Sequence, residues 1–136
     1  MRFLDADFFL RYLTRDDEVK ADACFRLFQR LKSGEERATT SEVIIAEVVY
    51  VLAARALYNL RPDEISARLR PLLAVRGLRV AHKRSCLQAL DLYATYPFLD
   101  FEDALVVAEM ERQGIKTVLS YDRDFDRLEQ VSREEP

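Results

Sequence analysis

The feature of this 136-residue chain that most constrains its fold is the alternation of strand-like and helix-like segments. Short β-branched or apolar stretches at residues 2–4, 37–40, 78–82 and 117–121 predict strands. The stretches between them carry apolar residues three and four positions apart, which is typical of helices that bury one face. This alternation predicts an α/β sandwich with a mostly parallel sheet.

Local signals predict where several of these elements begin and end, within a single domain over residues 1–136. Thr39 fits the cap position of a helix over about 42–57. Pro71 predicts a kink or break in the helix before the third strand. Asp100 can cap a helix that ends near Gly114. The polar residues after about 129 are expected to form a loose tail.

The composition excludes several kinds of site. Three widely separated glycines cannot form a phosphate-binding loop, and a single histidine excludes centres that need two imidazoles. Cys24 and Cys86 cannot make a four-cysteine metal site, and as buried free thiols they suit a reducing, cytoplasmic compartment. No apolar run approaches the length of a membrane span, so no membrane partner is expected. The net charge is −3, and the 24 acidic side chains are the most available chemistry.

Four acidic residues stand in positions where acids are uncommon. Glu47 lies within an apolar helical run, and no cation stands three or four positions away, so it needs a distant partner or a place at the helix edge. Asp5 and Asp122 directly follow predicted strands, and Asp103 begins an apolar helix. Each aspartate also has a simpler explanation, because aspartates commonly cap helices and form turns.

The shared position of these four acids is more informative than any one of them. Ligands of parallel α/β sheets bind outside the carboxyl ends of the strands, and all four acids could reach that end. Clustered carboxylates repel one another unless protons or cations offset their charge. Hard oxygen ligands favour Mg²⁺ or Mn²⁺, as one or two ions. Such ions activate water and stabilise the oxyanions of phosphodiester hydrolysis.

The segments 3–13, 41–52, 100–105 and 119–125 together resemble a PIN domain, most closely the VapC-type toxins of bacterial and archaeal toxin–antitoxin pairs. The resemblance covers nearly the whole chain in order and spacing. It implies a PIN-like fold, a three-layer α/β/α sandwich with a mostly parallel central sheet of about five strands. It also implies a metal-dependent endoribonuclease with an RNA substrate, a homodimer and a small neutralising antitoxin. The acidic quartet of the family, which is both catalytic and metal-binding, falls on Asp5, Glu47, Asp103 and Asp122.

Further candidates lie close to the predicted site in sequence, and they are Asp7, Ser41, Ser120 and Asp124. Asp7 stands where the family usually has asparagine, which adds negative charge, and Ser120 keeps the hydroxyl of a usual threonine. Arg11 and Arg15 lie one helical turn apart and are the first candidates for phosphate contacts.

Three other functions stay open at this point. A housekeeping PIN nuclease would have no antitoxin, and a non-catalytic RNA-binding or partner-binding module would bind metal weakly. A Mg²⁺-binding receiver domain would need an acid pair and a lysine after a late strand. Asp5 and Asp7 resemble that acid pair only weakly, and Lys116 precedes its predicted strand instead of following it. The sequence therefore favours the ribonuclease hypothesis.

Overall fold

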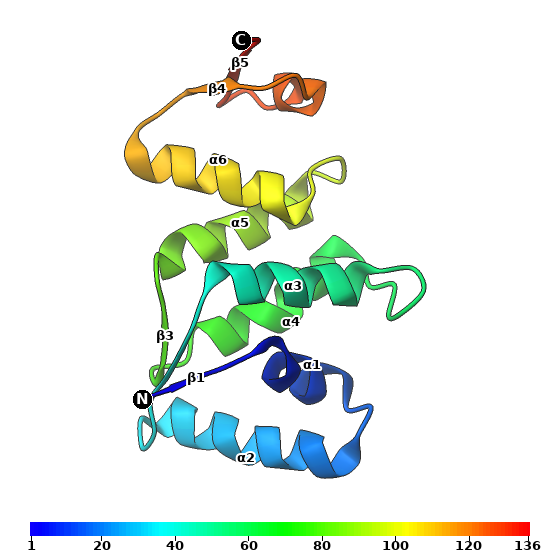
Figure 1. Cartoon of the computed structure of the whole chain (residues 1–136), viewed down its shortest axis with the longest axis vertical. Helices are drawn as coiled ribbons and strands as arrows, with labels where there is room; N and C mark the ends of the chain where they lie inside the picture. Colours follow the sequence, from blue (N-terminus) through cyan, green and yellow to red (C-terminus); the bar gives the residue numbers. More distant parts are fainter.

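A computed structural model describes all 136 residues, and Figure 1 shows its elements from the amino to the carboxyl terminus. In chain order these are β1 (Arg2–Phe3), α1 (Ala6–Thr14), α2 (Glu18–Ser33), β2 (Ala38–Thr40), α3 (Glu42–Ala53), α4 (Pro62–Leu73), β3 (Leu78–Val80), α5 (Lys83–Thr95), α6 (Phe101–Gln113), β4 (Thr117–Leu119), the 3₁₀ helix η1 (Arg123–Arg127) and β5 (Ser132–Glu134). No helix has both the length and the apolar character that a membrane crossing requires.

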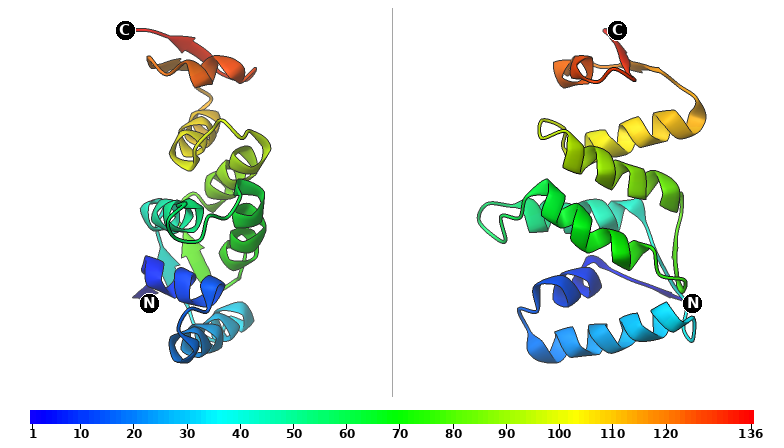
Figure 2. Two further views of the ribbon diagram at one scale, coloured as in Figure 1. Left: turned by 90° about the vertical axis from the view of Figure 1, so that its right-hand side faces the viewer. Right: turned by 180° about the vertical axis from the view of Figure 1, so that it is seen from behind.

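The five strands are divided between two parallel sheets. The amino-terminal sheet has the order β1-β2-β3, and the carboxy-terminal sheet pairs β4 with β5. Figures 1 and 2 show the carboxy-terminal sheet at one end of the molecule and the amino-terminal sheet in the other half, next to α2, with α5 and α6 between the two sheets. The predicted α/β class with parallel strands is confirmed, whereas the expected single central sheet is replaced by one sheet of three strands and one of two.

The division leaves β1 and β4 each with one unpaired edge. Strand β1 has only two residues, so it offers few backbone groups to a further strand. The side chain of Phe3 on β1 is 58% exposed, and that of Leu119 on β4 is 65% exposed. Both strands therefore expose an apolar side chain.

The core joins all the helices and the amino-terminal sheet into one cluster of 31 buried residues. Helix α3 buries the stripe formed by Ile45, Val48, Val49 and Leu52, because these positions share one helical face. Strand β3 buries Leu78 and Val80 while Arg79 between them is exposed, which is the alternation of a half-buried strand. The predicted free thiols are confirmed, with Cys86 buried and Cys24 half-buried.

The helix α3 differs at both ends from its prediction. Ser41, not Thr39, is its cap, and the Ser41 hydroxyl accepts a hydrogen bond from the Ile44 N–H at 3.5 Å. Thr39 belongs to β2, where its hydroxyl instead donates to the Arg79 carbonyl at 2.9 Å. The helix ends at Ala53, because the backbone of Ala54 is extended.

Two further expectations are wrong. Helix α4 runs without a break through Pro71, whose exposed position lets the ring face solvent while the helix gives up one backbone donor. The tail is not loose, because residues 132–134 form β5. The Ser132 N–H donates to the Lys116 carbonyl at 2.8 Å, and the Ser120 N–H donates to the Glu134 carbonyl at 2.9 Å.

Candidate active site

Asp5 lies at the carboxyl end of β1 and begins α1. Its Oδ1 accepts a hydrogen bond from the Ala6 N–H at 2.7 Å, so the side chain acts as the helix cap while staying exposed to solvent. Asp7 is exposed in the first turn of the same helix. The cap leaves the second oxygen of Asp5 available to a ligand.

Glu47 lies on the exposed face of α3. Its neighbours along that face, Val43 and Tyr50, are 76% and 71% exposed, whereas the buried stripe of the helix faces the opposite way. The apolar neighbours predicted from the sequence are therefore present, but they do not bury the carboxylate. The reading of Glu47 as a residue at the helix edge describes this structure, and the apolar face around it lacks a covering element.

Asp103 stands in the first turn of α6, and its N–H donates to Asp100 Oδ1 at 2.8 Å. The predicted cap role of Asp100 is thereby confirmed. The pKa of Asp103 is raised to about 6, first by burial and then by the negative charges of Asp100 and Asp122. Asp122 belongs to the loop after β4, so two acids that are distant in sequence act on each other here.

The loop after β4 holds Asp122 in a defined turn. The Ser120 hydroxyl accepts a hydrogen bond from the Asp122 N–H at 3.0 Å, and Asp122 Oδ1 accepts one from the Asp124 N–H at 2.9 Å. The Oδ1 atom of Asp124 lies 3.9 Å from a guanidinium nitrogen of Arg127. The side chain of Arg133, only 12% exposed, donates to the Ser120 carbonyl at 2.9 Å and so fastens this loop to β5. Ser120 thus positions Asp122.

The helices that carry Glu47 and Asp103 meet at a shared hollow of about 230 Å³. Its lining includes Tyr50, three residues after Glu47, together with Asp100 and Glu102, which both precede Asp103, but neither Glu47 nor Asp103 itself. The carboxyl-terminal part of α3 and the first turn of α6 therefore meet at this hollow, and its acidic residues come from α6 and its cap.

The structure places the four predicted acids unevenly. Asp103 and Asp122 lie within electrostatic range of each other, whereas neither Asp5 nor Glu47 is among the main causes of the raised pKa of Asp103. No three acidic, histidine or cysteine side chains lie where they could hold one metal ion. The donor chemistry suits Mg²⁺ or Mn²⁺, but this arrangement of the donors does not fit such an ion.

The two predicted phosphate-binding arginines are engaged in ion pairs. Arg11 binds Asp16 at 2.8 Å, and Arg15 binds Glu18 at 2.8 Å and Asp22 at 2.7 Å. A phosphate would have to displace these carboxylates. The sequence reasoning missed Asp100 as a source of negative charge for Asp103, although its place three residues earlier could have indicated this role.

These features define an α/β protein in which acidic residues follow parallel strands or begin the helices beside them. The sequence model of the PIN domain matches residues 2–131, and the chain belongs to the PIN domain family. That membership places it among the PIN-domain nucleases and confirms the resemblance predicted from the sequence.

Individual proteins show more distant similarity. The chain is 27% identical over 128 residues to a VapC ribonuclease of Aquifex aeolicus, a match that covers 94% of this chain and 92% of the relative. A solved structure of Mycobacterium tuberculosis VapC20, described as a sarcin–ricin loop cleaving toxin, aligns with a TM-score of 0.42 and 21% identity, over 93% of this chain and 94% of that one.

Proposed function

We propose that this protein is a metal-dependent endoribonuclease of the VapC type. The observation that carries the proposal is the match of the PIN domain over residues 2–131. The similarity to a VapC ribonuclease along nearly the full length of both chains supports the same conclusion. Within that family frame, the acids that follow β1 and β4 and begin α6 are the groups with which this chain can do hydrolytic chemistry.

The four acids Asp5, Glu47, Asp103 and Asp122 are the proposed ligands of one or two Mg²⁺ or Mn²⁺ ions. When bound, such an ion would activate water and offset the charge of the phosphate oxygens. The carboxylates alone would repel a phosphodiester, so the acidic residues need the cation before the substrate can approach. The pKa of Asp103 is raised first by burial and then by the charges of Asp100 and Asp122, and a bound cation would offset those charges.

The proposed site also requires the two sheets to come together. Strands β1 and β4 each have a free edge, and both expose apolar side chains there. Parallel pairing of these edges would make one five-stranded sheet and would bring the residues that follow the strands, Asp5 and Asp122, to the same end. Metal binding would stabilise this closed arrangement, since it removes repulsion among the acids.

Smaller roles fall to neighbouring side chains. Ser120 orients Asp122 through the backbone of the loop, and Ser41 caps the helix that carries Glu47. Asp7 and Asp124 are secondary candidate ligands, and each stands two residues after a member of the quartet in sequence. Arg11 and Arg15 would contact phosphate only by exchanging their present carboxylate partners.

The test is RNA cleavage by purified protein with Mn²⁺ or Mg²⁺. Cleavage is expected with metal and not with a chelator, and Asp5→Asn or Asp103→Asn should abolish it. The matched control is Asp63→Asn, which removes an exposed aspartate on α4. The proposal is wrong if the native protein cleaves no RNA with either metal, or if Asp5→Asn cleaves as well as the control does.

The toxin assignment adds a small antitoxin partner, a homodimer and a cytoplasmic location to the proposal. Co-expression with the product of a short upstream reading frame should yield a complex that no longer cleaves RNA. Size measurement in solution tests the dimer. An active nuclease that neither co-purifies with such a product nor is inhibited by it would be a housekeeping enzyme instead.

A further inference from the structure

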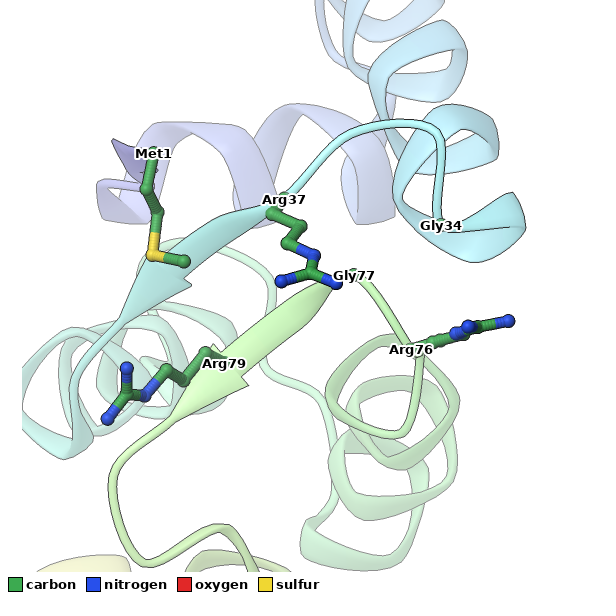
Figure 3. Close-up of a pocket in the computed structure, with 6 residues that line it drawn as sticks. All are labelled: Met1, Gly34, Arg37, Arg76, Gly77 and Arg79. Atoms are coloured by element: carbon green, nitrogen blue, oxygen red, sulfur yellow. The ribbon is translucent and has the colours of Figure 1, made fainter.

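A hollow of about 310 Å³ lies at the beginning of strands β2 and β3, and Figure 3 shows the residues around it. Its lining is Met1, Gly34, Arg37, Arg76, Gly77 and Arg79. Three of these residues are arginines and none is acidic. In the close-up, Arg37 extends from the residue before β2 and Arg79 from β3, while Arg76 comes from the turn before β3 and points away from the other two. The hollow therefore gathers positive charge from three separate points of the backbone.

The three arginines have no acidic partner, since no carboxylate forms an ion pair with Arg37, Arg76 or Arg79, and all three side chains are exposed. Glu36 is the nearest acid in sequence to Arg37, and it is already shared by Arg2 and Arg30. The positive charge at the hollow is therefore not neutralised within the molecule, in a chain whose net charge is negative.

The floor of the hollow is fixed by backbone contacts. The Gly77 N–H donates to the Leu31 carbonyl at 2.9 Å, and the Gly77 carbonyl accepts from the Ala38 N–H at 2.9 Å. A side chain at this position would lie within 3.0 Å of the Glu36 and Leu31 carbonyl oxygens, so only glycine fits. These bonds hold the end of α2 and the starts of β2 and β3 together. The arginines consequently project from a rigid base.

We propose that this arginine hollow binds the phosphodiester backbone of RNA, at the end of the amino-terminal sheet opposite to Asp5. A guanidinium group matches a phosphate with two parallel hydrogen bonds, and three of them around one hollow can hold successive phosphates. The inference rests on the proposed function in taking RNA as the substrate. It adds a contact surface, away from the acidic residues, that holds one part of the RNA.

The lining favours a nucleic acid over an acidic protein. Met1 is the only hydrophobic residue in it, whereas the centre of a protein interface is usually rich in apolar and aromatic side chains. Phosphate recognition requires only donors and positive charge, which the three arginines supply. The location also separates positive from negative charge along the sheet, so the backbone of a long RNA could contact the hollow while a distant part of it reaches the acids.

The experiment measures the binding of a labelled single-stranded RNA of about 20 nucleotides to the full chain in EDTA, over a range of salt concentrations. Three variants are compared with the native protein. The first is the triple substitution Arg37→Gln, Arg76→Gln and Arg79→Gln. The second has the same net charge and replaces exposed arginines without ion partners elsewhere, Arg26→Gln, Arg55→Gln and Arg68→Gln. The third changes the three hollow arginines to lysine.

The hollow variant should bind about tenfold more weakly or worse, and its slope of log affinity against log salt should fall by about 2, since each phosphate contact on a single strand contributes about 0.7. The control variant should lose less than half as much on both measures. The lysine variant should keep the salt slope but lose affinity, because ammonium groups do not bind phosphate in the bidentate manner.

Equal losses in the hollow and control variants, or native binding by both, would overturn the proposal. Unchanged RNA binding with weaker binding of poly-glutamate would assign the hollow to an acidic protein and would also overturn it. If the glutamine variant does not fold, as judged by circular dichroism, the lysine variant decides by the same comparison. Cleavage is absent in EDTA, so a failure of the metal-dependent nuclease proposal would not affect these results.

Discussion

The amino-terminal and carboxy-terminal sheets are both built from short parallel strands, yet they differ in what covers them. Leu78 and Val80 of β3 are buried by the surrounding helices, whereas Thr117 and Leu119 of β4 are exposed. In parallel sheets both faces are normally covered, because the connecting helices lie on them. The two sheets therefore differ in how far the core buries their side chains and not in how their strands pair.

This difference also separates the candidate ligands. Asp5 follows a strand of the amino-terminal sheet, and Asp122 follows a strand of the carboxy-terminal one. A site that uses residues from both sheets is only as well ordered as the less well packed of the two sheets. Variants in the two sheets should therefore differ in their effects, and the largest effects are expected in the more tightly packed amino-terminal sheet.

The largest effect is expected at Gly77, next to the amino-terminal sheet. Gly77→Ala should lower the free energy of unfolding by at least about 3 kcal/mol, because the added methyl group meets backbone oxygens that cannot move aside. Gly114→Ala, next to the carboxy-terminal sheet, should cost only about 1 kcal/mol. It has open space around it and pays only for its positive φ of 72°. Urea unfolding of both variants checks the contrast, and equal losses would contradict it.

A pair of leucines tests the coverage of the two sheets directly. Leu78→Ala should cost about 2.5 kcal/mol, because the side chain is 2% exposed and leaves a cavity. Leu119→Ala should cost less than about 0.5 kcal/mol when β4 stays exposed. If Mn²⁺ closes β4 onto β1, the cost at Leu119 should rise when unfolding is repeated with the metal. No change with metal would count against the closure.

The charge at Asp103 should make the metal-free protein less stable. Its pKa of about 6 lies above the ordinary value of 3.8, so the charged form is disfavoured in the folded state. The cost is absent below about pH 4 and develops as the pH rises through 6. Asp103→Asn should therefore raise the unfolding free energy at pH 7 by about 1 kcal/mol, a value reduced for solvent screening. Unfolding at pH 4 and pH 7 should show the gain only at pH 7.

The smallest effect is expected in the loop after β4. Ser120→Ala removes the acceptor for the Asp122 N–H and should cost about 0.5 kcal/mol, since the bond is exposed. Its larger consequence should be weaker metal binding by a less ordered Asp122. Calorimetric titration with Mn²⁺ measures this, with Ser33→Ala at the end of α2 as the control. Identical titrations for both variants would exclude a positioning role for Ser120.

Sequence reasoning predicted the fold best where apolar periodicity and capping act locally. Four strands, the extent of α6 and its cap at Asp100 follow directly from such signals. The fifth strand was missed, because β5 is polar and is held by backbone bonds to β4 that no local pattern encodes. The break predicted at Pro71 does not occur for a related reason. Its exposed position, which the sequence does not show, lets the ring face solvent within a continuous α4.

The candidate site shows the same limit. The sequence predicts that Asp5 and Asp122 follow strands, and they do. It could not predict which sheet each strand would join, because strand order is decided by long-range packing and not by the residues of the strand. The exposure of Glu47 was likewise not readable from its neighbours. The apolar residues beside Glu47 lie on the exposed face, and the buried face is the one carrying Ile45 and Val48.

The anchor made by Arg133 gives residues 132–136 an importance that their polar composition conceals. The guanidinium of Arg133 binds Asp126 at 3.0 Å, Glu135 at 3.1 Å and the Ser120 carbonyl at 2.9 Å. An exopeptidase that trimmed only these five residues would remove the partner of β4 and the fastening of the Asp122 loop together. Such clipping would inactivate the protein without touching any of the four acids, and an intact mass is therefore worth confirming before any inactive preparation is interpreted.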